Sequence, residues 1–153
     1  MDRDLGPGVG QIFKESGLNV RLHQEVFSEK SAQDSVADEI WLRHCGNNGW
    51  VAVSRDNDIT RTPASVAAVM ESGARLFILR GQLPHPELAA QFLGAIDKIH
   101  RTLARETGGF IARVKRETFP RSRGKFVVDI SIFMNQKKWA SNVGGEHSAP
   151  DKA

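Results

Sequence analysis

The stretch Val51-Ala-Val-Ser-Arg-Asp-Asn-Asp-Ile59 (VAVSRDNDI, residues 51–59) places an apolar run directly before two aspartates. The apolar and β-branched residues predict a buried strand over residues 50–54, and the polar residues behind it predict a turn. Asp and Asn are common in turns because their side chains bond nearby backbone N–H groups. The sequence therefore raises the question of whether Asp56 and Asp58 only form this turn or also carry chemistry.

Helix-like and strand-like segments alternate on both sides of this stretch. Apolar periodicity predicts helices over residues 7–16, about 36–46, 62–73 and 86–106. Strands are predicted over residues 18–22, 50–54, 74–79, 110–116 and 125–133. Short strands separated by helices predict the α/β class, with three α/β/α layers, a mostly parallel central sheet and a C-terminal β-hairpin.

The length and composition of the chain indicate one domain. A chain of 153 residues is long enough to bury a core, and we expect the domain to cover residues 1–139, with the hairpin over 110–133. Residues 140–153 contain few apolar side chains and are predicted to be disordered. The single cysteine, the absence of an 18-residue apolar run and the absence of a signal peptide predict a cytoplasmic protein without a membrane span.

The net charge of +3 is unevenly distributed. Residues 1–112 hold 12 basic and 14 acidic residues, whereas residues 113–138 hold 8 basic and 2 acidic residues. This asymmetry indicates a polyanionic partner that meets the basic hairpin. A hairpin that is charged only because it is solvated stays open as an alternative.

Acidic residues stand at three comparable places in the predicted topology. Asp2 and Asp4 precede the first helix, Asp38 and Glu39 lie in the first turn of the second, and Asp56 follows the strand over residues 50–54. Ligands of parallel sheets bind beyond the carboxyl ends of the strands. Clustered carboxylates suit a hard cation, which makes Mg²⁺ or Mn²⁺ the expected ligand.

The order of DRDLG (2–6), H-x-E-x-F (23–27), DEIWLRHCGNNGWVAVSRD (38–56), a proline-opened helix and ARLFIL (74–79) resembles the PIN-domain ribonucleases. In particular it is similar to the PIN-like branch related to VapC-type toxins of toxin–antitoxin pairs, over about residues 1–114. The resemblance implies a three-layer PIN-like domain. It also implies a Mg²⁺-dependent endoribonuclease that cleaves RNA phosphodiester bonds and has a protein antitoxin as its partner.

The resemblance also assigns site residues. It implies catalytic, metal-binding roles for Asp2, Asp38 and Asp56, support from Asp4 and Asp58, and a hydroxyl at Ser54 that holds a carboxylate or water. Glu25 and Asp34 are candidates for an additional acid of the family. The residues expected to bind the RNA backbone by charge are those of the hairpin: Arg113, Lys115, Arg116, Arg121, Arg123 and Lys125.

One departure concerns the start of the sheet. The family has an apolar strand before its first acid, whereas only Met1 precedes Asp2 here. We therefore expect either that the reading frame begins upstream or that this strand is missing from the sheet. A damaged site of this kind would suit a non-catalytic PIN-like module that binds RNA or protein.

A second enzyme class remains as an alternative. The D-x-D of Asp2 and Asp4 also begins the motif of haloacid-dehalogenase phosphatases, although the later residues of that motif have no match. The sequence leaves the oligomeric state open, a homodimer included.

Overall fold

Four strands form one mixed sheet. The structure, a computed structural model, describes residue 1 and residues 5–27, 37–118 and 126–148. The strands are β1 (Val51–Ser54), β2 (Arg75–Leu79), β3 (Phe110–Thr118) and β4 (Phe126–Met134), in the order β1-β2-β3-β4. The pairs β1–β2 and β2–β3 are parallel, and β3–β4 is antiparallel. The predicted mostly parallel sheet with a C-terminal hairpin is confirmed.

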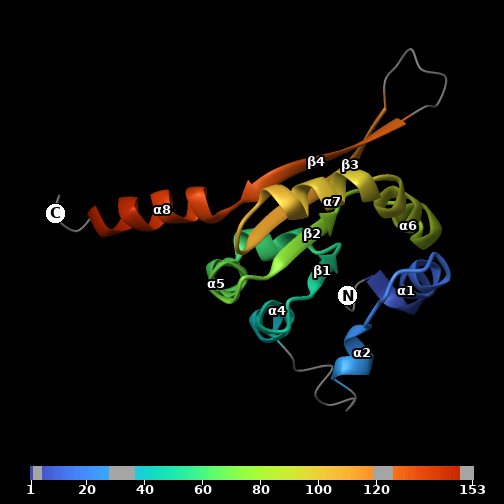
Figure 1. Ribbon diagram of the computed structural model, residues 1–153, viewed down its shortest axis with the longest axis horizontal. Coiled ribbons are helices and arrows are strands. Elements are labelled where there is room, and N and C mark those ends of the chain that lie inside the picture. Colours follow the sequence, from blue (N-terminus) through green and yellow to red (C-terminus); the bar gives the residue numbers. More distant parts are fainter. Residues whose placement is uncertain (2–4, 28–36, 119–125, 149–153) are drawn as a thin grey trace.

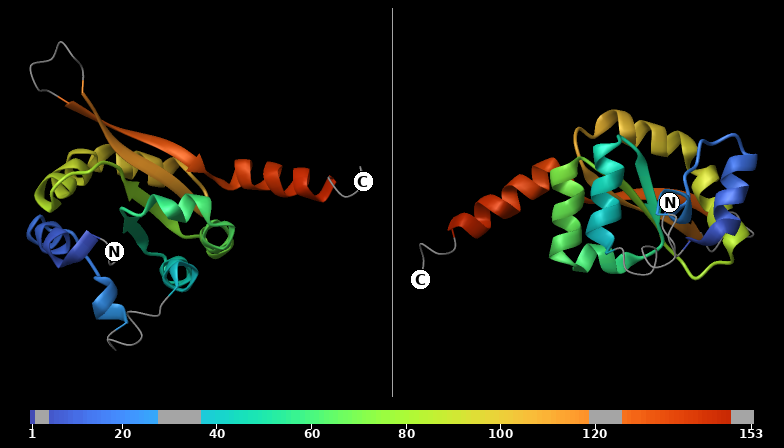
Figure 2. Two further views of the ribbon diagram at one scale, coloured as in Figure 1. Left: turned by 180° about the vertical axis from the view of Figure 1, so that it is seen from behind. Right: turned by 90° about the horizontal axis from the view of Figure 1, so that it is seen from below.

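Helices cover both faces of this sheet (Figures 1 and 2). One face is covered by α1 (Gly6–Glu15), α6 (His85–Gly94) and α7 (Ile96–Arg105), whose apolar side chains join Phe77 and Phe110 in one buried cluster. The other face is covered by α4 (Asp38–Asn47) and α5 (Pro63–Ser72), which bury Leu76 and Ile78. The α/β/α layering follows because successive side chains of each strand point to opposite faces.

Local sequence signals account for both ends of α5. In α5 a proline occupies the first turn after Thr62, and Gly73 ends the helix with a φ of 78°. This left-handed conformation costs glycine nothing, and Ala74 N then donates to Val69 O at 3.1 Å. These boundaries agree with the predicted helix over residues 62–73.

Two predicted elements were wrong. No strand forms over residues 18–22, where the chain lies extended and then enters the short helix α2 (His23–Val26). Strand formation needs a paired neighbour, and none of the described strands pairs with residues 18–22. The long helix predicted over residues 86–106 is interrupted at Ala95, with φ −99° and ψ 7°, directly after the weak helix former Gly94.

The chain is helical beyond β4, and the disorder expected over residues 140–153 stays a prediction. Helix α8 (Gln136–Ser148) continues the chain beyond β4 and projects away from the body in Figure 1. Two local features begin it: Lys138 N donates to Asn135 Oδ1 at 3.0 Å, and Trp139 packs against the cluster under α4 and α5. Both contacts lie before residue 140, at the start of α8. Residues 149–153 lie outside the described residues.

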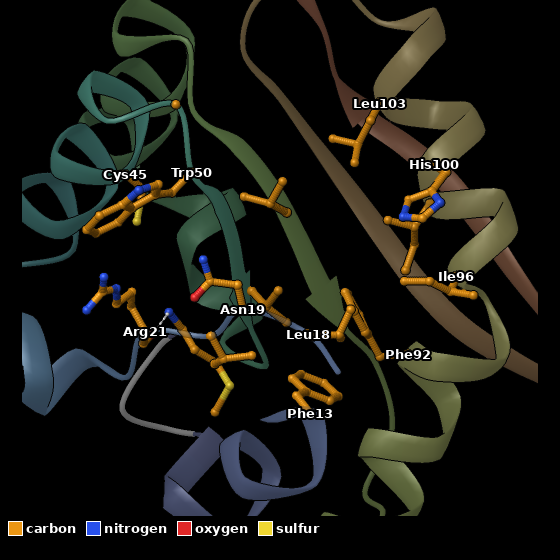
Figure 3. A pocket seen from close by; sticks show the side chains of 16 residues that line it. Phe13, Leu18, Asn19, Arg21, Cys45, Trp50, Phe92, Ile96, His100 and Leu103 are labelled. Carbon is orange, nitrogen blue, oxygen red and sulfur yellow. Dashed lines mark hydrogen bonds between the residues drawn. The ribbon is translucent and has the colours of Figure 1, made fainter. Parts of the chain in front are cut away.

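A groove runs along the outer edge of β1. Its volume is about 410 Å³, and it lies between residues 18–21 on one side and β1 on the other (Figure 3). Its apolar walls come from three helices, with Phe13 from α1, Phe92 from α6 and Leu103 from α7. Since β1 ends the order of described strands, its outer backbone groups pair with no described strand.

We predict that an apolar segment of Val and Ile residues fused ahead of Met1 raises the melting temperature by several degrees. Met1 lines the groove, so such a segment would begin beside the open edge of β1. Each well-buried aliphatic side chain contributes about 1.5–3 kcal/mol, and about 1 kcal/mol shifts the melting temperature of a domain this size by about 2–4 °C. Thermal unfolding measures the shift.

The matched control is a Gly/Ser segment of equal length, for which no rise is expected. Equal melting temperatures for both fusions would contradict the prediction that the groove accepts a strand.

Candidate metal centre

The turn after β1 is built around Asp56. Ser54 is fully buried, and its Oγ accepts a hydrogen bond from Asp56 N at 3.0 Å. The Asp56 carboxylate in turn caps the short 3₁₀ helix η2 (Asn57–Arg61), because its Oδ1 accepts from Asp58 N at 2.9 Å. The turn-forming role of Asp56 is therefore confirmed, and its metal-binding role stays a prediction.

The carboxylate of Asp38 is also oriented by its surroundings. Asp38 lies in the first turn of α4, where the helix dipole favours negative charge. Trp41, one turn later and buried, donates from Nε1 to Asp38 Oδ1 at 3.2 Å. The indole thus fills the core under α4 with its ring and fixes a partly exposed carboxylate with its only polar group.

Chain direction brings Asp38 and Asp56 to the same end of the sheet. Helix α4 leads into β1 through the tight turn at Asn48 and Gly49, which reverses the direction of the chain. Ten helical residues rise about 15 Å, and the six steps from Trp50 to Asp56 span about 20 Å if extended. The start of α4 therefore lies near the carboxyl end of β1.

An open depression lies at this end of the sheet. Arg55, Asp56, Asn57 and Asp58 line it, and its volume is about 410 Å³. Asp58 is exposed and makes a long ion pair of 3.4 Å with Arg61. The oxygen donors that line it are the carboxylates of Asp56 and Asp58 and the side-chain amide of Asn57, which suit Mg²⁺ or Mn²⁺ and would leave room for water and substrate.

The described residues do not by themselves complete a metal site. Across the described ranges, no group of three or more His, Cys, Asp or Glu side chains is placed to hold a metal ion. Asp2 and Asp4 lie outside the described residues, as does Asp34. The predicted set of Asp2, Asp38 and Asp56 thus has two described members, and the set as a whole stays a prediction.

Glu25, a candidate for the additional acid, has a structural role. Its Oε1 accepts from Lys14 Nζ at 2.7 Å, and its Oε2 accepts from Leu22 N at 2.9 Å. The hydrogen bond from Lys14, and then the one from Leu22, lower the pKa of the Glu25 carboxyl below its ordinary value. Glu25 thus joins α1 to the first turn of α2.

The described basic residues of the hairpin differ in their surroundings. Lys115 is exposed and lies opposite Asp129 on β4, and Arg116 Nη2 lies 3.8 Å from Glu87 Oε2. Arg113 is partly buried: its Nε donates to Asn57 Oδ1 at 3.2 Å, and its Nη2 donates to Thr60 Oγ1 at 3.5 Å. Arg121, Arg123 and Lys125 lie outside the described residues.

Sequence reasoning missed Asn57, Thr60 and Phe133, all of which contact Arg113. Asn57 and Thr60 are ordinary turn residues by sequence, and only the pairing of strands brings them to Arg113. No local signal could have found them.

Comparison with known proteins agrees with this architecture. Residues 1–81 match a family described as a PIN like domain, and the chain belongs to that family. A protein of Mycobacterium tuberculosis named "Putative ribonuclease VapC45" is 32% identical over 116 residues, which are 74% of this chain and 83% of that protein. No solved structure matches the chain.

We predict that Trp41 and Asp38 are energetically coupled. Trp41→Phe keeps an aromatic ring and removes the N–H, whereas Asp38→Ala removes the acceptor. In a double-mutant cycle measured by urea unfolding, the coupling free energy should be about 1.5–3 kcal/mol, the range for hydrogen bonds to charged groups. Strictly additive losses would show that the bond contributes nothing.

Proposed function

We propose that this protein is a Mg²⁺-dependent endoribonuclease that hydrolyses RNA phosphodiester bonds and is the toxin of a toxin–antitoxin pair. The observation that carries the proposal is the position of Asp38 and Asp56 at one end of the sheet, on a chain of the PIN-like family. The similarity to a protein named as a ribonuclease supports the same activity.

The proposed roles follow from the geometry. Asp38 and Asp56, with Asp2, would hold the cation, while the bonds from Trp41 and Asp58 fix the first two carboxylates in place. A bound Mg²⁺ would polarise the scissile phosphate and lower the pKa of a bound water. Ser54 supports Asp56 by accepting from its backbone N–H. Asp4 and Asp58 would support these three acids at the edge of the metal site.

The substrate would meet the basic hairpin. Lys115 and Arg116 on β3, together with Arg121, Arg123 and Lys125 in the sequence that follows it, would supply the positive charge. RNA phosphates bind such surfaces with release of counterions, independently of base sequence. A protein antitoxin is the proposed regulator, by analogy with the toxin branch that the sequence resembles.

Two alternative functions have less support than a ribonuclease. A non-catalytic RNA- or protein-binding module would follow if Asp2 failed to join the other two acids. The haloacid-dehalogenase interpretation of Asp2 and Asp4 is disfavoured, because the chain belongs to the PIN-like family.

Within the part of the chain that the structure describes, none of the helices has the length and apolar character of a membrane span.

We predict that Asp38→Asn and Asp56→Asn each abolish Mg²⁺-dependent RNA cleavage. Asn keeps the shape and an oxygen acceptor for the bonds from Trp41 and Asp58, so the fold should persist while the ligand charge is lost. Melting temperature without metal should stay the same or rise, and the Mg²⁺-induced rise should disappear in both variants. Cleavage with Mg²⁺, Mn²⁺ or chelator is the primary measurement.

Asp97→Asn on α7 is the matched control, because Asp97 is exposed on a helix that covers the opposite face. Its cleavage should equal that of the unmodified protein. Full cleavage by the Asp38 and Asp56 variants would show that these carboxylates serve only in local structure. Absence of cleavage by the unmodified protein across RNAs, with RNA binding intact, would favour the non-catalytic module.

We predict that Arg121→Glu with Arg123→Glu weakens RNA binding and flattens its dependence on salt. The slope of log affinity against log salt concentration falls by roughly 0.7 for each single-strand phosphate that the protein no longer neutralises. The cleavage rate at saturating RNA should change little. Arg101→Glu with Arg105→Glu, on α7, makes the same charge change outside the hairpin sequence and should leave the slope unaltered. Equal salt slopes for the two double variants would contradict an RNA-binding site on the hairpin.

A further inference from the structure

We propose that Arg113 is a positioning residue that holds the loop carrying Asp56, and that it acts through Asn57 and Thr60. Arg113 lies in the middle of β3, while Asn57 and Thr60 belong to η2, more than 50 positions earlier in the chain. Its guanidinium donates to one side-chain oxygen of each. This inference rests on the proposed function, because it assigns Arg113 a role in preparing Asp56 for a cation.

Strand register explains how Arg113 reaches η2. Ser54 on β1 pairs with Ile78 on β2, and Ile78 pairs with Arg113 on β3. Paired residues point to the same face, so these three side chains form a row across the sheet on the side covered by α4 and α5. The Arg113 side chain therefore extends over β2 toward the turn that begins beyond Ser54.

The Arg113 guanidinium also contacts an aromatic ring on β4, the strand next to its own. Its Cζ lies 4.6 Å from the centroid of the Phe133 ring on β4, a cation–π contact that limits its freedom. Thr60 Oγ1, which accepts from Arg113, itself donates to Asn57 O at 2.7 Å. Arg113, Asn57, Thr60 and Phe133 thus form one connected cluster, called here the Arg113 clamp.

The clamp requires arginine in particular. A guanidinium is planar, donates in two fixed directions and stacks on an aromatic face, whereas a lysine ammonium is a compact point charge. Arg113→Lys keeps the charge but cannot reproduce both bonds and the stacking. Loss of the clamp would leave the Asn57 side chain without this donor and loosen the residue that directly follows Asp56.

The clamp and a phosphate-binding role make opposite predictions. A positioning residue affects the geometry of Asp56, so its loss should reduce kcat and raise the Mg²⁺ concentration needed for half-maximal activity. Removing groups that orient metal ligands typically costs about 10–100-fold in affinity or activity. An arginine that binds RNA phosphate should instead raise KM and reduce the salt slope, with kcat nearly unchanged.

The test compares Arg113→Lys, Arg113→Met and Asn57→Ala with Lys115→Met. Lys115 lies two residues further on the same face of β3 and is exposed, so it is the matched control for a phosphate contact. For both Arg113 variants and for Asn57→Ala we expect about a 10-fold or larger loss of kcat, a weaker Mg²⁺-induced rise in melting temperature and an unchanged salt slope. The double variant Arg113→Met with Asn57→Ala should lose little more kcat than either single variant, because both changes break the same contact.

A metal-free readout separates this inference from the proposed function. Amide hydrogen exchange of residues 57–61 without Mg²⁺ should be faster in the Arg113 and Asn57 variants and unchanged in Lys115→Met. Unchanged exchange, or a reduced salt slope with kcat intact in Arg113→Met, which removes the charge, would overturn the clamp. Absence of cleavage by the unmodified protein would count against the ribonuclease proposal, and hydrogen exchange and the Mg²⁺-dependent melting shift would still decide the role of Arg113. Asn57→Ala, at a partly exposed position, keeps the test decisive if Arg113→Met does not fold.

Discussion

Burial of β2 on both faces and along both edges is the constraint on which the rest of the structure depends. Residues 76–79 have almost no exposed surface, and β1 and β3 pair with β2 on its two sides. A strand in this position can bury its apolar side chains only if helices cover both faces of the sheet, because these side chains alternate between the two faces. Phe77 meets Phe92 and Phe110 edge-on at one face, while Leu76 and Ile78 pack under α4 and α5 at the other.

This burial determines where polar chemistry can lie. Between Leu76 and Leu79 the side chains of β2 are committed to the two cores, so charged groups near them lie beyond strand ends or at helix ends. Further along β3 and β4, strand residues such as Lys115 and Asp129 carry charge where they are at least partly exposed. Asp38, Asp56 and the residues of η2 occupy strand or helix ends, and Arg113 reaches them from β3 as a partly buried exception. Arg113 can stay in the sheet because two oxygens and an aromatic face surround its guanidinium, which satisfies a group that would otherwise be costly to bury.

Much of the fold could be predicted from sequence because its signals are local. Pro63 and Gly73 mark the ends of α5, and the apolar runs of β1 and β2 predict strands buried on both faces. The features that could not be predicted depend on partners distant in the chain. Residues 18–22 have strand composition but pair with no described strand, and Trp139 at the start of α8 packs against a core formed by α4 and α5. The contacts of Arg113 depend on the register across β1, β2 and β3, which composition does not contain.

Turn formation and metal binding are not alternatives at Asp56. A carboxylate has two oxygens with about four lone-pair sites, so one capping bond to Asp58 N does not exhaust its capacity as a ligand. Capping also does not require charge, because a neutral Asn at the same position caps about as well. The bond from Trp41 to Asp38 could likewise be made to a neutral amide oxygen. Local structure therefore explains how these two side chains are oriented, whereas their negative charge at one end of the sheet is the property that a cation would use.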